Sequence, residues 1–217
     1  MQNTYVVKHN EIIAQKLIKN LQKRFFESYF VNTKEEALEK AIELIPKTDI
    51  ISWGGSVSVE EIGLIDYITK NNYKYIDRSS AKSAEQRMFL LKKAMLSDTY
   101  LMGTNAISYD GELVNIDANG NRTAALMFGP RNVVIIAGLN KAVPTLEEAM
   151  TRAKKTAAPV NMQRIAEKSG RQTPCLVTGE CMNCISPDSI CSHTVITRLC
   201  NPAGRIKIIL VNENLGF

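Results

Sequence analysis

The sequence of 217 residues has no uninterrupted apolar run close to the roughly 20 residues that a membrane-spanning helix requires. Its first residues, MQNTYVVKHNEII, are too polar for a secretory signal peptide. We therefore expect a cytoplasmic protein that does not associate with a membrane. Apolar residues make up 45% of the chain, which argues against disorder and favours one globular domain.

Cysteine is absent from residues 1–174 and then occurs five times before residue 201. An odd number of thiols in a cytoplasmic protein argues against a disulfide framework. The thiols are then metal ligands, a reactive pair or buried structural residues. They are Cys175, Cys181, Cys184, Cys191 and Cys200.

Basic residues are in excess only near the end of the chain. Residues 1–150 carry 18 basic and 18 acidic side chains, so the net charge of +5 arises in residues 151–217. A basic segment of this kind is typical of proteins that bind nucleic acid, an acidic protein or an anionic ligand. Nucleic acid is disfavoured because no aromatic residues are interleaved with these charges to stack on bases. The structural alternative is a solvated helix face.

Hydrophobic periodicity predicts an α/β fold. Two helices are expected before any strand: one over residues 11–30, with apolar residues every four positions, and one that begins after Thr33 and ends at Pro46. Short apolar runs then alternate with helical patterns, as in an open, mostly parallel sheet with crossover helices. The predicted strands are 49–53, 73–76, 99–102, 133–137 and 206–211, and the predicted helices are 58–70, 84–96 and 147–167.

A hairpin interrupts this alternation. Asp110-Gly111 is a two-residue turn signal between strand-forming residues, so a hairpin over 105–117 is expected between the third and fourth parallel strands. We treat residues 1–217 as one domain. It divides into a helical lead-in (1–46), an α/β core (47–170), a cysteine-rich appendage (171–203) and a final strand (204–217).

Two segments have the composition of a ligand site. Gly54, Gly55 and Ser56 lie where a buried strand gives way to a helix, a junction at which free N–H groups favour an anion such as a carboxylate, a phosphate or coenzyme A. A tight structural turn is the alternative. The second segment is rich in short polar residues, in which Asp117 could act as a base and Arg122 could clamp an anion, although tight turns also use such residues. Its other candidate ligand-binding residues are Gly103, Asn105, Asp110, Gly111, Asn115 and Asn121.

Three motifs, in this order, resemble the LUD-domain (lactate utilization) family, formerly called DUF162: WGGSVSVEEIGL, GTNAISYDGELVNIDANGNRTAALMFGP and TPCLVTGECMNCISPDSICS. The resemblance covers nearly the whole chain, including the terminal VNENLGF. It implies the fold of ribose-phosphate isomerases and CoA transferases, with a pocket in which the glycine turn faces the polar segment. The pocket residues that it implies are Gly54, Gly55, Ser56, Asn105, Asp110, Gly111, Asp117, Asn121 and Arg122. It also implies a role beside iron–sulfur subunits that oxidise L-lactate to pyruvate.

The cysteine segment contains one C-x-x-C pair, Cys181 and Cys184, with Cys175 and Cys191 near enough to complete four thiolates. Four thiolates suit zinc or an iron–sulfur cluster. The spacing is not that of a ferredoxin and a second C-x-x-C is absent, so structural thiols and a redox pair at Cys181 and Cys184 stay open.

Three functions follow from these observations. The first is a component of L-lactate, or similar hydroxy-acid, utilization that works with iron–sulfur partner subunits. The second is an independent isomerase or an enzyme that handles sugar phosphates or CoA esters. The third is a non-catalytic, metal-dependent binding module. Assembly into a homo-oligomer is compatible with each.

Overall fold

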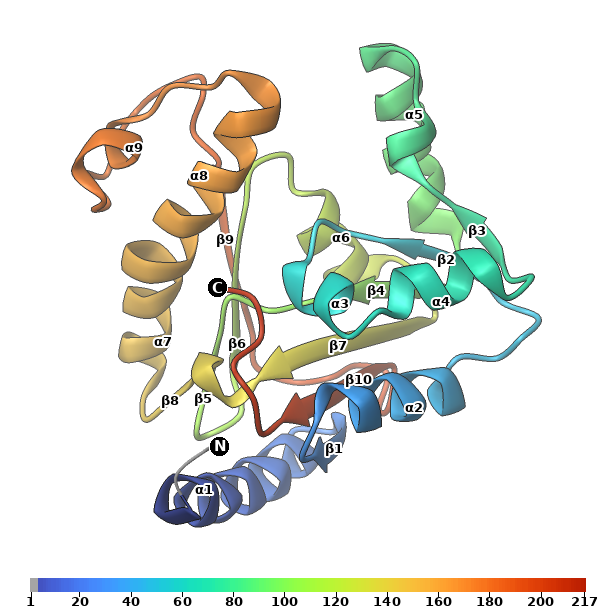
Figure 1. The fold of residues 1–217 in the computed structure, drawn as a ribbon, viewed down its shortest axis with the longest axis vertical. Helices are drawn as coiled ribbons and strands as arrows, with labels where there is room; N and C mark the ends of the chain where they lie inside the picture. Colours follow the sequence, from blue (N-terminus) through green and yellow to red (C-terminus); the bar gives the residue numbers. More distant parts are fainter. Residues whose placement is uncertain (1–3) are drawn as a thin grey trace.

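The computed structural model describes residues 4–217, in which the larger of two sheets has six parallel strands in the order β1-β10-β7-β4-β2-β3 (Figure 1). This arrangement confirms the predicted open parallel sheet with crossover helices. All five predicted parallel strands are present within two residues of their expected limits. The strands are β1 (Glu27–Val31), β2 (Ile50–Trp53), β3 (Lys74–Ile76), β4 (Thr99–Met102), β7 (Asn132–Gly138) and β10 (Ile206–Val211).

Side-chain alternation along β7 divides the interior into two cores. Val133 and Ile135 pack on one face with α1 (Thr4–Lys23) and α6 (Asn121–Phe128). Val134 and Ile136 pack on the other face with α2 (Lys34–Leu44), α3 (Val57–Glu61) and α4 (Leu64–Lys70). Because both faces are buried, these strands read in the sequence as continuous apolar runs. Among the described residues, no helix is both long and apolar enough to cross a membrane.

The predicted hairpin is confirmed, and it belongs to a second sheet with the order β8-β5-β6-β9. β5 (Ala106–Ser108) and β6 (Leu113–Asp117) are its arms, β8 (Ala142–Val143) pairs with β5, and β9 (His193–Thr197) pairs antiparallel with β6. β9 thus ties the end of the cysteine-rich segment to the rest of the domain. β8 and β9 were not predicted from the sequence.

A helical column flanks this second sheet (Figure 1). It consists of α7 (Leu146–Arg152), a π-helical turn η4 (Ala153–Ala157) and α8 (Ala158–Ser169), and it corresponds to the predicted helix over 147–167. Pro159 has no N–H to donate, which favours a local departure from α-helical hydrogen bonding. The short helix α9 (Pro174–Thr178) follows.

The expectation that two helices precede any strand is wrong. α1 ends at Lys23, Phe25 adopts a left-handed conformation with φ of 64°, and Glu27–Val31 forms the edge strand β1. The predicted helix over 58–70 is divided at Gly63, whose φ is 74°. The predicted helix over 84–96 is α5 (Ala84–Lys93) followed by a 3₁₀ turn η2 (Ala94–Leu96). Two other 3₁₀ turns are η1 (Arg78–Ser80) and η3 (Leu139–Lys141).

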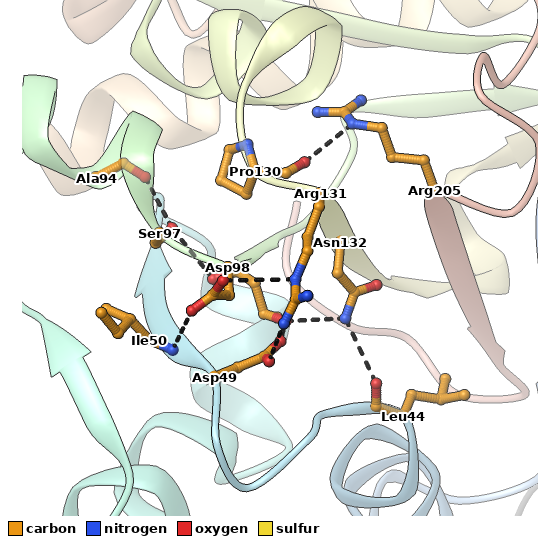
Figure 2. Close-up of polar contacts among 11 residues, drawn as sticks. Leu44, Asp49, Ile50, Ala94, Ser97, Asp98, Pro130, Arg131, Asn132 and Arg205 are labelled. Atoms are coloured by element: carbon orange, nitrogen blue, oxygen red, sulfur yellow. Dashed lines mark hydrogen bonds and ion pairs between the residues drawn. The ribbon is translucent and has the colours of Figure 1, made fainter.

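A polar network fastens the amino-terminal ends of the central strands (Figure 2). The buried carboxylate of Asp49 accepts hydrogen bonds from Arg131 (2.7 Å) and Thr99 (2.7 Å). Asp98 accepts the backbone N–H of Ile50 at 2.9 Å. Both carboxylates have hydrogen-bond partners within the chain, so the amino-terminal ends of these strands have a structural role. A ligand is expected beyond the opposite, carboxyl-terminal ends.

Candidate functional site

Three loops meet beyond the carboxyl ends of β2, β4 and β7. Gly55 and Ser56 follow β2, Gly103 and Asn105 follow β4, and Lys141 follows β7, and all five line one small recess of about 40 Å³. Ser56 also fixes the first loop, because its hydroxyl accepts the N–H of Val59 and so caps α3. The structure therefore brings the glycine turn and the start of the polar segment together.

Two glycines make room for functional side chains. A Cβ atom on Gly54 would lie 2.6 Å from Cγ of Arg122, and one on Gly103 would lie 2.7 Å from Oγ of Ser56. Neither position requires a positive φ. These glycines are needed because Arg122 and Ser56 pass directly over the backbone.

A wider cleft of about 500 Å³ also borders Gly55. Asp117 is the one carboxylate that lines it among the described residues, whereas its cationic side chains number six. Burial lowers the pKa of Arg78, and Arg87 and Arg122 lower it further. A group of guanidinium ions with so little counter-charge is a site for an anion. The six cations are Arg78, Arg87, Arg122, Arg164, Lys168 and Arg171.

Lys141 lies at the recess with only 4% of its surface exposed. Its Nζ donates a hydrogen bond to Oγ of Ser58 at 2.8 Å. Burial lowers the pKa of Lys141 from 10.5 to about 7, with Arg152 and Arg122 lowering it further and Glu61 opposing them. An amine with this pKa exchanges a proton near neutral pH. Lys141 was not among the residues predicted from the sequence, although a single lysine just after the longest buried strand was a usable signal.

Asp117 and Arg122 both line the cleft, and their contacts join them to the start of α6. Oδ2 of Asp117 accepts the N–H groups of Arg122 (2.9 Å) and Thr123 (3.2 Å), while the Arg122 guanidinium donates to the carbonyl of Ile116 at 2.6 Å. Asp117 therefore holds the arginine in place. Its predicted role as a base stays a prediction. Asp117 lines only the cleft, whereas Lys141 lines the recess.

The three asparagines of the polar segment have different surroundings. Asn121 lines the cleft, where its side chain hydrogen-bonds the hydroxyl of Tyr100, whose pKa is raised by burial. Asn105 accepts the N–H of Ile116 at 2.8 Å and so braces the second sheet. Asn115 is fully buried, and neither polar atom of its side chain has a hydrogen-bond partner in residues 4–217.

The hairpin turn lies away from the recess. The backbone carbonyl of Asp110 accepts a hydrogen bond from Arg24 at 2.6 Å, and Gly111 packs against the backbone of α1 near Leu21. Neither Asp110 nor Gly111 lines the recess or the cleft. Their contacts are those of a turn that secures the second sheet to α1.

The four candidate metal-binding cysteines line one separate cavity of about 180 Å³. Burial raises the pKa of Cys191 to about 11, and the other three thiols of the set raise it further. In residues 4–217, no three side chains of His, Cys, Asp or Glu converge closely enough to hold a metal ion. A tetrahedral zinc ion, which needs thiolates at about 2.3 Å, therefore does not fit this arrangement. The four are Cys175, Cys181, Cys184 and Cys191.

Comparisons with known proteins give one solved structure that shares this fold and one weaker match. A DUF162 family protein from Deinococcus radiodurans, solved as a crystal structure, has 11% identity to this chain and a TM-score of 0.53, covering 93% of this chain and 98% of its own. A ribose 5-phosphate isomerase A from Methanocaldococcus jannaschii has 16% identity and a TM-score of 0.34, covering 63% and 66%. No curated protein matches the sequence. The sequence model of the LUD domain matches residues 14–211, and the chain therefore belongs to the LUD domain family.

Proposed function

We propose that this chain is a cytoplasmic component of L-lactate utilization, which binds an α-hydroxy acid in the recess and works with iron–sulfur partner subunits. The observation that carries the proposal is the pairing of two arginines, Arg122 and Arg164, with the buried amine of Lys141 around one small recess. The recess has room for the carboxylate end of a small acid, and it adjoins the wider cleft through shared lining residues.

The chemistry assigns each side chain a separate task. The guanidinium groups of Arg122 and Arg164 bind the carboxylate, because their planar N–H donors match its two oxygens. Lys141 in its neutral form accepts the proton of the α-hydroxyl group. Oxidation of the hydroxy acid to a keto acid then breaks the bond between the α-carbon and its hydrogen. The two electrons pass to the iron–sulfur groups of the partner subunits, and the second proton passes to solvent.

A second candidate function rests on the wider cleft. A volume of about 500 Å³ and six cationic side chains exceed what one carboxylate requires. A sugar phosphate or the diphosphate of coenzyme A would use more of these cations. The chain would then be an independent isomerase or a CoA-handling enzyme, with the reacting group in the recess and the phosphates outside it.

Ligand binding separates the two candidates. Thermal unfolding would be followed with L-lactate, pyruvate, ribose 5-phosphate and coenzyme A, since a ligand at 100 times its dissociation constant stabilises a protein by about 2.7 kcal/mol. L-Lactate or pyruvate should raise the melting temperature. Stabilisation by the phosphorylated compounds alone would support the second candidate, and no stabilisation by any of them would contradict both.

A matched pair of variants locates the ligand. Arg164→Gln removes a cation that lines both the recess and the cleft. Within residues 4–217 its side chain hydrogen-bonds only its helical neighbour Asn161. Lys168→Gln removes a cation of the cleft that does not line the recess. A small acid in the recess predicts that the first substitution weakens binding and the second leaves it unchanged. L-Lactate-dependent electron transfer, measured with the iron–sulfur subunits and lost in Arg164→Gln, would then connect binding to the reaction.

A further inference from the structure

Four thiols from one segment, residues 175–191, line the cysteine cavity. Cys175 lies on α9, Cys181 and Cys184 lie in the loop after it, and Cys191 lies just before β9. Most of the remaining wall is apolar. Its apolar side chains come from β6, α8 and the loop itself: Ile116, Ala158, Pro159, Met162, Met182 and Ile190.

The arrangement of the four thiols around the cavity argues against a single metal ion. A single metal ion draws its ligands together, whereas no three of these side chains converge to that degree among the described residues. In an iron–sulfur cluster each thiolate binds a different iron atom, so the ligands surround the cluster rather than meet at a point. A cavity of about 180 Å³ between four thiols provides that space.

The polar part of the wall suits a negatively charged group. Lys154, on the π-helical turn, lines the cavity, and its Nζ donates a hydrogen bond to Oδ1 of Asn183 at 2.9 Å. Asn183 lies between Cys181 and Cys184 and has a φ of 53°, so the chain turns sharply there and both thiols reach the same cavity. The lysine thereby fixes this turn and adds a positive charge beside the thiolates.

From these observations we infer that the chain itself carries a [4Fe–4S] cluster, bound by Cys175, Cys181, Cys184 and Cys191. This inference is independent of the proposed function, because it uses none of the cleft's cations. The two cavities are nevertheless adjacent. Ile116 and Ile190 line both of them, so these two side chains would separate a cluster in the cysteine cavity from an anion in the basic cleft.

The test is anaerobic reconstitution of the full chain with iron and sulfide, followed by removal of unbound reagents. We expect a brown protein with broad visible absorption and about four iron atoms and four sulfide ions per chain, the composition of a [4Fe–4S] cluster. One-electron reduction should bleach the band and produce a paramagnetic signal. Iron without sulfide, one zinc ion per chain, or a colourless metal-free protein would each overturn the inference.

Two serine variants provide the comparison. Cys184→Ser removes a proposed ligand and should abolish iron and sulfide binding. Cys200→Ser makes the same change outside the cavity, where a hydroxyl can still donate to the carbonyl of Pro202 and accept the N–H of Ile206. It should keep the cluster. Equal iron content in both variants would refute the assignment, and far-ultraviolet circular dichroism of each would establish that it is folded. L-Lactate binding should also be measured on the cluster-free Cys184→Ser variant. Binding that persists there would show that the recess functions without the cluster, so the two proposals can fail separately.

Discussion

Replacing Lys141 by methionine removes a buried ammonium group and keeps a side chain of similar length. Lys141 is 4% exposed, and its amine hydrogen-bonds the hydroxyl of Ser58. The substitution removes that bond and also removes the cost of keeping a charge in a buried site. The second effect is the larger at neutral pH, because the pKa of this amine is lowered to about 7.

The magnitude follows from proton linkage. The unfolded chain holds the lysine proton up to about pH 10.5, whereas the folded chain releases it near pH 7. The unfolded state therefore binds more protons between these values, and the contribution of Lys141 to the free energy of unfolding rises with pH by up to about 1.4 kcal/mol per unit. At pH 7 the buried amine lowers stability by about 4 kcal/mol relative to a neutral one. The lost hydrogen bond offsets about 1 kcal/mol of this.

Lys141→Met should therefore be more stable than the native chain by about 2 to 3 kcal/mol at pH 7. The difference should shrink by about 2 kcal/mol by pH 9, where the native lysine is neutral in the folded state. Urea unfolding of both proteins at several pH values measures it, with Lys168→Met, a lysine in an exposed position, as the control. A difference that does not vary with pH would refute the burial argument. The variant should also lose any reaction that needs a proton acceptor at the recess.

Three other substitutions test separate parts of the structure. Gly54→Ala places a methyl group 2.6 Å from Cγ of Arg122 and should weaken anion binding by about tenfold or more in calorimetric titration, so an unchanged affinity would contradict the close-approach argument. Asp49→Ala removes the buried carboxylate that binds Arg131 and should lower the free energy of unfolding by about 2 kcal/mol in urea, whereas a loss below about 0.5 kcal/mol would show the network to be dispensable. Thr145→Ala breaks the capping box of α7 and should cost about 1 kcal/mol in the same assay, with no change if α7 is held by packing alone.

The sequence predicts the parallel strands well because burial on both faces makes them short, continuous apolar runs, as in Val133–Ala137. It fails at Glu27–Val31, because the apolar positions there continue the helical spacing of α1 while aromatic residues favour a strand. It also misses β9, whose residues are exposed or half-buried and form no continuous apolar run. Tertiary pairing with β6 forms this strand.

The site is less predictable than the fold, because its residues come together only through tertiary structure. The glycine turn and Arg122 have local signals, since a strand-to-helix junction and a polar segment are visible in the sequence. No local signal of comparable strength marks Arg78, Arg164 or Lys141, because each is a single basic residue in the sequence. They come together only because η1, α8 and η3 pack around the recess and the cleft. The same holds for the low pKa of Lys141, which depends on burial rather than on its neighbours in the chain.

Ile116 and Ile190 form a wall shared by the cysteine cavity and the basic cleft, so binding in one cavity can be coupled to binding in the other. An occupant that shifts this wall from one side alters the shape available on the other, and such coupling is reciprocal. If a metal group in the cysteine cavity changes the affinity of the cleft for an anion by some factor, the anion must change the affinity for the metal group by the same factor. Anion titrations of metal-loaded and metal-free protein would measure that factor as the ratio of the two anion affinities. A factor of one would show that the shared wall does not move when either cavity is filled.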